Sequence, residues 1–294
     1  MTPMNVMVRP RSVATLAGMA GATLRAPDDG VLLGMPQLSG IGLSESWLLK
    51  ELGHRHWMGL AKAAGMDAPD FRDEAGRPVY AAFCAIRTEG ARFELGRENG
   101  RLSIATALSR VSRTQVLSRH ALTIDGLAAG TVEMVSAFVK RTGISNHSIA
   151  RVPIGGLGPG DQSDSDLPEL AASFRSGRIS RHLGFDLTGD AADGATCLFD
   201  PCPAQDFNGA GFLYFTSFLG FIDRAEWQLG HGRPAPMSGR EAYYYGNVDA
   251  GERLRVVLVA RHASSLWWQV RRADTATVLA DVFTRRGPDA ATRA

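Results

Sequence analysis

The stretch DFNGAGFLYFTSFLGFID, residues 206–223, decides how this chain is expected to fold. A glycine-containing turn leads into an apolar run that predicts a helix over 213–229, with an apolar side made of Phe215, Phe218, Leu219, Ile222 and Trp227. Runs rich in β-branched and aromatic residues follow at 241–245, 253–263, 265–272 and 277–284, with hairpin-length breaks near 264 and 273. This half is therefore predicted to be one long helix followed by antiparallel strands.

The first half of the chain repeats this order of elements. Residues 42–65 predict a helix with Ser44 as its N-cap and with Glu45 where the helix dipole favours an acid. Strand-like runs follow at 78–87, 101–123 and 130–141, and the middle run is long enough for a hairpin or a bent strand. A helix followed by strands on short turns, twice over, predicts an α+β fold with two tandem antiparallel sheets, each wrapped on a long helix.

The composition is that of a globular protein: 294 residues, 45% apolar and 21% charged, with a net charge of +2. Scattered arginines interleaved with acids give no footprint for nucleic acid. No run approaches the about 20 apolar residues that a membrane helix needs. Three cysteines are too few for a disulfide framework, which favours a reducing cytoplasm.

Two stretches, 153–168 and 188–194, combine glycine, proline, serine and aspartate in a way that is typical of loops. We therefore expect an N-terminal extension at 1–30, a first sheet-and-helix unit at 31–150 and a linker at 151–182. A second unit is expected at 183–286 and a polar tail at 287–294.

The block at 206–223 resembles the loop-into-helix signature of hot-dog acyl-thioester enzymes, in which a polar residue and a glycine precede an aromatic-rich helix. More narrowly, it resembles the bifunctional acyltransferase/decarboxylase of leinamycin biosynthesis and its relatives in polyketide clusters. The blocks YGNVD (245–249), PVYAAFCAIR (78–87) and, more weakly, SNHSI (145–149) extend the resemblance over about residues 31–285.

The resemblance implies a double hot-dog fold and an acyltransferase/decarboxylase that uses a malonyl- or methylmalonyl-type CoA. It also implies two partners, an acyl-CoA donor and an acyl carrier protein that accepts the acyl group. Decarboxylation of such a thioester needs neither a metal nor a cofactor, and neither is expected. Whether two copies form a homodimer is left open.

A strand tyrosine is the acyl-accepting residue in the leinamycin enzyme, and pairing the blocks puts Cys84 at that position and Tyr80 at an upstream tyrosine. Cys84 could carry an acyl group, because a thiolate is a good nucleophile, or it could be a small buried strand residue. Tyr80 could be a nucleophile or a hydrogen-bond donor, or a strand aromatic with a solvated hydroxyl. The two residues face the same way if the strand is regular.

Asn208 and Gly209 precede the second helix, whose first N–H groups could stabilise a thioester oxyanion. The alternative is a plain helix start with Asn208 as its cap. Four further residues are predicted to contact substrate: Tyr214, Ser217, Tyr245 and Asn247. For Ser217, the alternative is a bond to its own helix backbone.

His147 or His56 could pair with Asp206 or Asp223 as in hot-dog dehydratases, although neither histidine follows a recognisable dehydratase block. His54 and His56 are expected on a solvated helix face, and Cys197 and Cys202 lack a matching ligand pair for zinc. Two alternatives to the acyltransferase remain: dehydration or thioester hydrolysis on a carrier-bound chain, and a non-catalytic module that binds the carrier.

Overall fold

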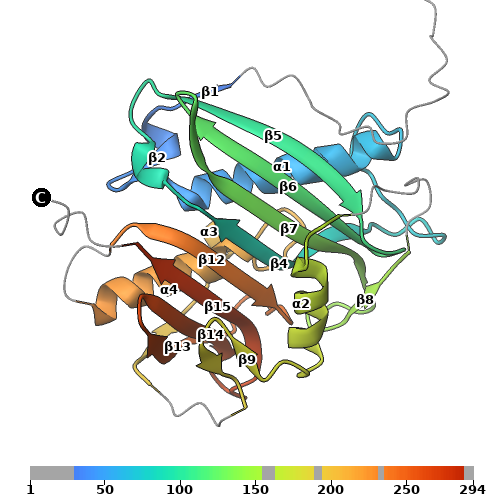
Figure 1. Cartoon of the computed structure of the whole chain (residues 1–294). Coiled ribbons are helices and arrows are strands. Elements are labelled where there is room, and N and C mark those ends of the chain that lie inside the picture. The colour runs from blue at the N-terminus through green and yellow to red at the C-terminus, as the bar shows by residue number, and fades with distance from the viewer. Residues whose placement is uncertain (1–29, 154–162, 189–193, 231–234, 288–294) are drawn as a thin grey trace, which may run out of the picture.

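The computed structural model describes residues 30–153, 163–188, 194–230 and 235–287. The extension expected at 1–30 and the tail at 287–294 thus lie almost wholly outside the described residues. One antiparallel sheet of eleven strands dominates the described part of the chain, in the order β1-β5-β6-β7-β4-β12-β15-β14-β13-β11, with β8 paired to β7 (Figure 1).

The first half confirms the expected order of elements. Its one long helix is α1 (Glu45–Ala63), and its long strands are β4 (Tyr80–Glu89), β5 (Arg101–Arg110), β6 (Gln115–Ile124) and β7 (Leu127–Arg141). The run at 101–123 is a hairpin rather than a bent strand. The short elements are β1 (Val31–Leu32), η1 (Met35–Gln37), β2 (Leu38–Ser39), β3 (Gly42–Leu43), η2 (Phe93–Leu95) and β8 (Ile149–Arg151).

The second half follows the same plan. Its long helix is α4 (Phe215–Leu229), and its strands are β12 (Met237–Tyr244), β13 (Leu254–His262), β14 (Ser265–Arg272) and β15 (Val278–Arg286). Before α4 come α2 (Leu167–Arg175), β9 (Arg181–His182), β10 (Phe185–Asp186), β11 (Thr196–Phe199) and α3 (Pro203–Asp206). The range expected to be a linker thus contains a helix, α2, whose Leu167 and Phe174 are buried.

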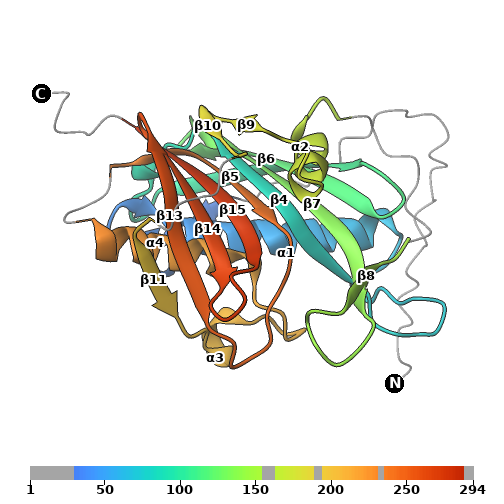
Figure 2. The same ribbon diagram turned by 90° about the horizontal axis from the view of Figure 1, so that it is seen from below.

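The two half-sheets join edge to edge at a seam. Strand β4 of the first half pairs with β12 of the second from Glu89↔Gly239 to Ala85↔Tyr243. The two expected sheets are therefore one continuous sheet, and the pairing satisfies an edge that would otherwise be open. Figure 2 shows α1 and α4 on one face of this sheet and α2 on the other.

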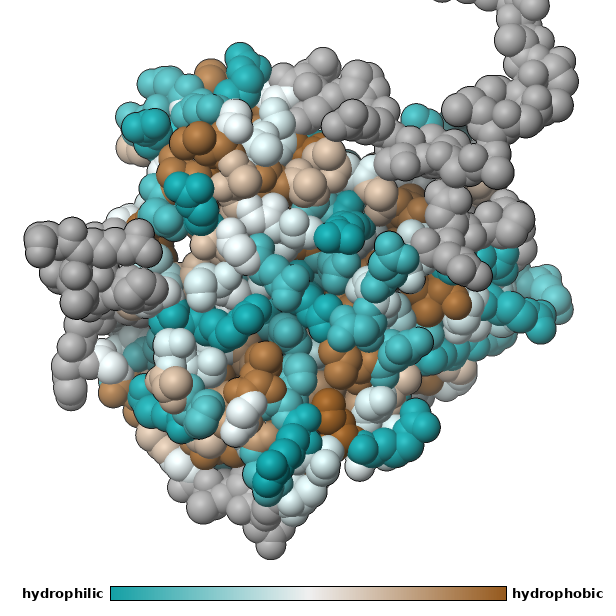
Figure 3. Space-filling model, in the orientation of Figure 1, coloured by the Kyte–Doolittle hydropathy of each residue, from teal (hydrophilic) through white to brown (hydrophobic). Residues whose placement is uncertain are grey.

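The main core lies between the sheet and the two long helices. It contains side chains from both halves, including Leu52 of α1, Phe218 of α4 and Trp268 of β14. A second cluster on the outer face packs α2 against the seam through Phe174 and Tyr243, whose rings stack at 3.8 Å. In Figure 3, this outer side carries hydrophilic residues interspersed with smaller apolar areas.

A buried arginine connects the two long helices. Arg240 of β12 is 2% exposed, and its guanidinium donates to Glu45 of α1 and to Asp223 of α4, both at 2.6 Å. It also donates to Thr284 of β15 at 3.2 Å. One side chain thereby joins both halves of the molecule at the helix-bearing face.

None of the helices in the described ranges combines the length and the apolar character needed to cross a membrane.

Candidate active site

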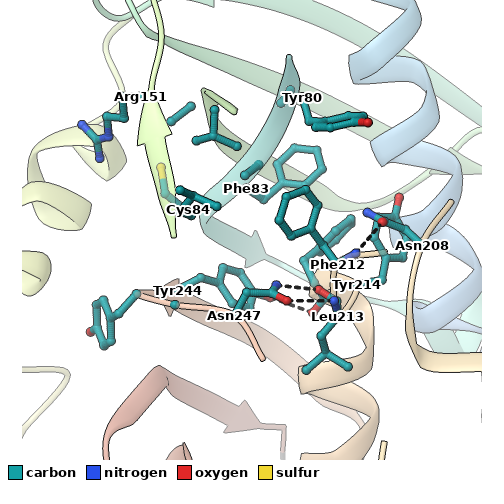
Figure 4. A pocket seen from close by; sticks show the side chains of 18 of the residues that line it. Tyr80, Phe83, Cys84, Arg151, Asn208, Phe212, Leu213, Tyr214, Tyr244 and Asn247 are labelled. Atoms are coloured by element: carbon teal, nitrogen blue, oxygen red, sulfur yellow. Dashed lines mark hydrogen bonds between the residues drawn. The ribbon is translucent and has the colours of Figure 1, made fainter. Parts of the chain in front are cut away.

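The seam opens into a cavity where β4 and β12 stop pairing. Past Ala85 and Tyr243 the two strands have no further register, and Cys84 is skipped in the β4–β7 pairing as a bulge between Phe83 and Ala85. A cavity of about 180 Å³ fills the gap and reaches the start of α4 (Figure 4). The opening of the sheet thus creates the space in which several predicted residues meet.

Six of the predicted residues line this cavity: Tyr80, Cys84, Asn208, Tyr214, Tyr245 and Asn247. Gly209 and Ser217 do not. A Cβ added at Gly209 would meet no atom within 4 Å, and the Ser217 hydroxyl donates to the Asp206 carbonyl at 2.9 Å. Ser217 therefore anchors the turn before α4, through a carbonyl eleven residues back rather than one in its own helix.

Asn208 shapes the turn that precedes α4. Its Oδ1 accepts the N–H groups of Ala210 (3.0 Å) and Phe212 (3.1 Å), while Gly211 adopts the left-handed φ of 74° that glycine tolerates best. The helix begins only at Phe215, with Tyr214 at the N-cap position and no side-chain cap, so Asn208 is not the cap. Its Nδ2 has no hydrogen-bond partner among the described residues, and it lines the cavity.

The uncapped start of α4 adds backbone donors to the site. The first N–H groups of an α-helix have no intrahelical partner. No other partner is found for the N–H of Phe215 within the described part of the chain. Because Tyr214, Phe215 and Phe218 all line the cavity, the positive end of the α4 dipole lies beside it.

Two residues that the sequence reasoning did not single out hold this turn from the first half. Arg141 donates to the Ala210 carbonyl and stacks over the Phe212 ring at 4.0 Å. Asn146, buried, donates to the carbonyls of Gly211 (2.7 Å) and Val248 (2.8 Å). Asn146 lies in the block at 145–149, which was the available signal. The turn is thus fixed by both halves together.

Asn247 holds the other end of the same turn. Its Oδ1 accepts the Leu213 N–H at 2.9 Å, and its Nδ2 donates to the Leu213 carbonyl at 3.0 Å. All of the polar atoms of this side chain are therefore used by the protein. Asn247 thereby positions Leu213, two residues before the helix, and one of the two N–H groups of its Nδ2 is used in doing so.

Cys84 lies at the outer end of the cavity. Its thiol donates to the Val135 carbonyl at 3.3 Å and accepts from the Gln115 amide at 3.6 Å. Burial raises the pKa of this thiol, and the positive charges of Arg151 and Arg175 oppose the rise. The thiol is therefore protonated at neutral pH and needs a local positive potential to react as a thiolate.

The tyrosines that line the cavity, Tyr80, Tyr214, Tyr244 and Tyr245, differ in what their hydroxyls do. Tyr80 packs edge-on to Phe212 at 5.8 Å, and its hydroxyl has no partner among the residues described. Because of the bulge at Cys84, Tyr80 and Cys84 are not on one regular strand, and only Cys84 joins the outer-face cluster. The hydroxyl of Tyr245 donates to Asp281 at 2.8 Å, so its ring, not its hydroxyl, is available to a ligand.

Among the described residues that line the cavity there is no histidine. His56 is fully buried between Ser118 and Ser136, at 2.8 Å from each hydroxyl, so the expectation of a solvated face is wrong for His56 and correct for the exposed His54. One group in the described residues, His147, Asp249 and Glu252, brings its ligand atoms within 4.8 Å of one another. It lies outside the cavity, and Asp249 is already occupied by the Ser145 hydroxyl and the Asn146 N–H.

Several solved structures are similar to this chain over most of its length. A 12:0-ACP thioesterase from Umbellularia californica aligns with a TM-score of 0.69 and 10% identity, covering 93% of this chain and 100% of that one. An acyl-ACP thioesterase from Bacteroides thetaiotaomicron aligns with a TM-score of 0.60 and 11% identity, covering 88% and 97%. The chain has a double hot-dog fold. The sequence matches no protein-family model and no curated protein.

Proposed function

We propose that this double hot-dog protein is an acyl-thioester enzyme of polyketide or related natural-product biosynthesis. It would transfer an acyl group from CoA to an acyl carrier protein and decarboxylate malonyl- or methylmalonyl-type groups. The observation that supports this best is the polar lining of the cavity at the uncapped start of α4. That lining consists of tyrosine side chains, amides, one thiol and two guanidinium groups. These groups suit donation to an oxyanion and binding of an anion.

Decarboxylation would proceed by cleavage of the bond between the carboxylate and the α-carbon. The electron pair of that bond becomes the enolate of the thioester, and neutral carbon dioxide leaves. The Nδ2 of Asn208 and the free N–H of Phe215 stabilise the enolate oxygen. The α-carbon then takes a proton from the Tyr80 hydroxyl or from water. The aromatic walls, Phe215 and Phe218, keep the site poorly solvated.

Acyl transfer would use Cys84 or Tyr80 as the acceptor. The thiol of Cys84 adds to the thioester carbonyl, the bond from carbon to the CoA sulfur breaks, and CoA leaves with the proton. The pantetheine thiol of the carrier protein then attacks the new thioester and restores the Cys84 thiol. Both steps are redox-neutral. With Tyr80 as acceptor, the intermediate is an ester of its hydroxyl.

Thioester hydrolysis is the second candidate, because two structures similar to this chain are named as thioesterases. Water would then replace the carrier thiol as the attacking group. Dehydration of a carrier-bound chain and simple carrier binding remain the other outcomes that an experiment should separate.

The test is intact-protein mass spectrometry after incubation with methylmalonyl-CoA, followed by addition of a carrier protein bearing its pantetheine arm. We expect an acyl adduct on the wild type, acyl transfer to the carrier, and loss of the adduct in Cys84→Ala or in Tyr80→Phe. Cys202→Ala is the matched control, because Cys202 is exposed and outside the cavity. If Cys84→Ala and Tyr80→Phe both load the carrier at the normal rate, the covalent route is wrong.

The products identify the alternatives. Free acid with no loaded carrier indicates a thioesterase, and loss of water from a 3-hydroxyacyl carrier indicates a dehydratase. Binding of the carrier by a protein that leaves every thioester intact would mean that it is a binding module.

A further inference from the structure

Two guanidinium groups lie at the outer end of the cavity, where no sequence motif had indicated a function. Arg151 ends β8, and Arg175 lies in the last turn of α2. Both line the cavity together with Cys84, and both charges act on its thiol. In Figure 4 the Cys84 sulfur points to the side of the cavity on which Arg151 lies.

Backbone carbonyls hold the Arg175 guanidinium in place, and among the described residues neither of the two charges is neutralised. Arg175 donates to the Tyr244 carbonyl at 2.9 Å and to the Tyr245 carbonyl at 3.4 Å, and both acceptors are uncharged. Within the described residues, no carboxylate lies at ion-pair distance from Arg151 or Arg175. Arg151 and Arg175 are exposed residues of the cavity lining, and partial burial of the guanidinium together with the charge of Arg151 lowers the pKa of Arg175.

We propose that Arg151 and Arg175 bind the free carboxylate of a dicarboxylic acyl group while the thioester carbonyl lies at the start of α4. This inference rests on the proposed function and assigns two specificity-determining residues to it. Guanidinium groups match the planar carboxylate in shape and charge. A carboxylate that is bound by Arg151 and Arg175 lies close to the Cys84 sulfur, at the reacting end of the substrate. The phosphate of a pantetheine arm, in contrast, lies at the far end of that arm from the sulfur.

The pair is a binding device rather than a group that drives bond cleavage. A carboxylate that becomes neutral carbon dioxide loses its ion pairs, so these contacts are stronger in the ground state than in the transition state of decarboxylation. Removal of one arginine should therefore raise KM for the dicarboxylic substrate and should not lower kcat for release of carbon dioxide. A purely structural defect would lower kcat as well.

The kinetic test compares Arg151→Gln and Arg175→Gln with Arg178→Gln, which removes an equal charge from an exposed position just after α2 and outside the cavity. With malonyl-CoA, we expect KM to rise about tenfold or more in each cavity variant and to stay unchanged in the control. With propionyl-CoA, which has no carboxylate, KM should be the same in all four proteins. The kcat for transfer should fall in both cavity variants, because each guanidinium opposes the raised pKa of the Cys84 thiol. Arg175→Lys, which keeps the charge, should recover part of the loss.

A binding measurement separates this inference from the proposed function. Unreactive CoA thioethers that end in a carboxylate or in a methyl group are titrated into each variant by calorimetry. The wild type should bind the carboxylate form more tightly, and both glutamine variants should lose that preference. Equal losses for the two thioethers would overturn the carboxylate assignment in favour of the CoA phosphates. A wild type that discriminates as expected but turns over no thioester would refute the proposed function alone.

Discussion

The two long helices of this molecule begin in opposite ways. At the start of α1, the Ser44 hydroxyl accepts the Trp47 N–H at 3.3 Å, and Glu45 in the first turn is paired with Arg240. At the start of α4, Tyr214 offers no cap, and the first turn faces the cavity. The repeated architecture thus uses one helix start for stability and leaves the other with free donors.

The two halves also differ in the space between the helix and the sheet, which is filled under α1 and contains a cavity beside α4. Under α1, a closed chain of hydrogen bonds runs from Ser136 through His56 and Ser118 to His120 and Thr106, with links of 2.8 to 3.0 Å. Beside α4, the corresponding polar groups surround an open cavity. The comparison teaches that polar groups in such a core are either all satisfied by one another or left for a ligand.

The largest expected effect comes from breaking the connection that Arg240 makes between the start of α1 and the middle of α4. Arg240→Met should lower the free energy of unfolding by about 3–5 kcal/mol, because it leaves Glu45 buried without its partner. Urea denaturation checks this value. Arg253→Met, at an exposed ion pair with Asp200, is the control and should change stability by less than about 1 kcal/mol. Equal effects of the two changes would contradict the role given to Arg240.

The role of the Asn208 side chain as a donor at the start of α4 can be tested while the turn at 208–212 is kept. Asn208→Asp keeps the oxygen that accepts the N–H groups of Ala210 and Phe212 but replaces the free Nδ2 donor by a carboxylate oxygen. We expect acyl-transfer activity to fall about 100-fold, the usual effect of removing one oxyanion donor. The thermal midpoint should stay within a few degrees of the wild type. Retained activity would show that Asn208 serves the turn alone.

The closed histidine chain in the first half predicts a loss of stability in acid. Burial lowers the pKa of His56 and His120 from the usual 6.5 to about 3. As the pH falls from 6.5 toward 3, the unfolded chain takes up protons that the folded chain does not. The free energy of unfolding should therefore fall by about 1.4 kcal/mol per pH unit for each histidine.

Denaturation curves at pH 7, 6 and 5 measure this dependence. His120→Gln should remove about half of the slope that the pair contributes. A wild type of constant stability over this range would rule out neutral, buried histidines.

The smallest expected effect is at the capped start of α1. Ser44→Ala removes the acceptor for the Trp47 N–H and should cost about 1 kcal/mol of stability. Acyl-transfer activity should not change, because Ser44 lies outside the cavity. Ser44→Asp, which can also cap, should restore the stability. A loss of activity in Ser44→Ala would mean that the two helix starts are not independent.

Local signals explain what the sequence predicted. The helix at α1 starts where Ser44 and Glu45 indicate, and the two hairpins of the second half turn near the predicted positions, because caps and alternating side chains act over a few residues. The cavity gathers Cys84 and Asn208 because Cys84 lies at a bulge within β4 and Asn208 lies in the turn before α4, two places where the backbone leaves its regular form.

Distant contacts explain what the sequence did not predict. The pairing of β4 with β12 joins residues about 150 positions apart, and the serine partners of His56 lie 62 and 80 residues away. Arg175 was not predicted as a site residue, because α2 lies in the range at 151–182 that was expected to be a linker. The reach of Arg141 across the seam to residue 210 has no local pattern at all.

Because the seam between β4 and β12 joins two halves of one chain, the molecule can have a single cavity at this seam. In a symmetric pair of identical chains, every substitution would appear in both copies, and any opening would be duplicated about the twofold axis. Here the two halves belong to one chain and differ in sequence. A cavity in one half therefore does not require a second cavity in the other. The half without the cavity can therefore keep a fully packed core and support the half that has the cavity.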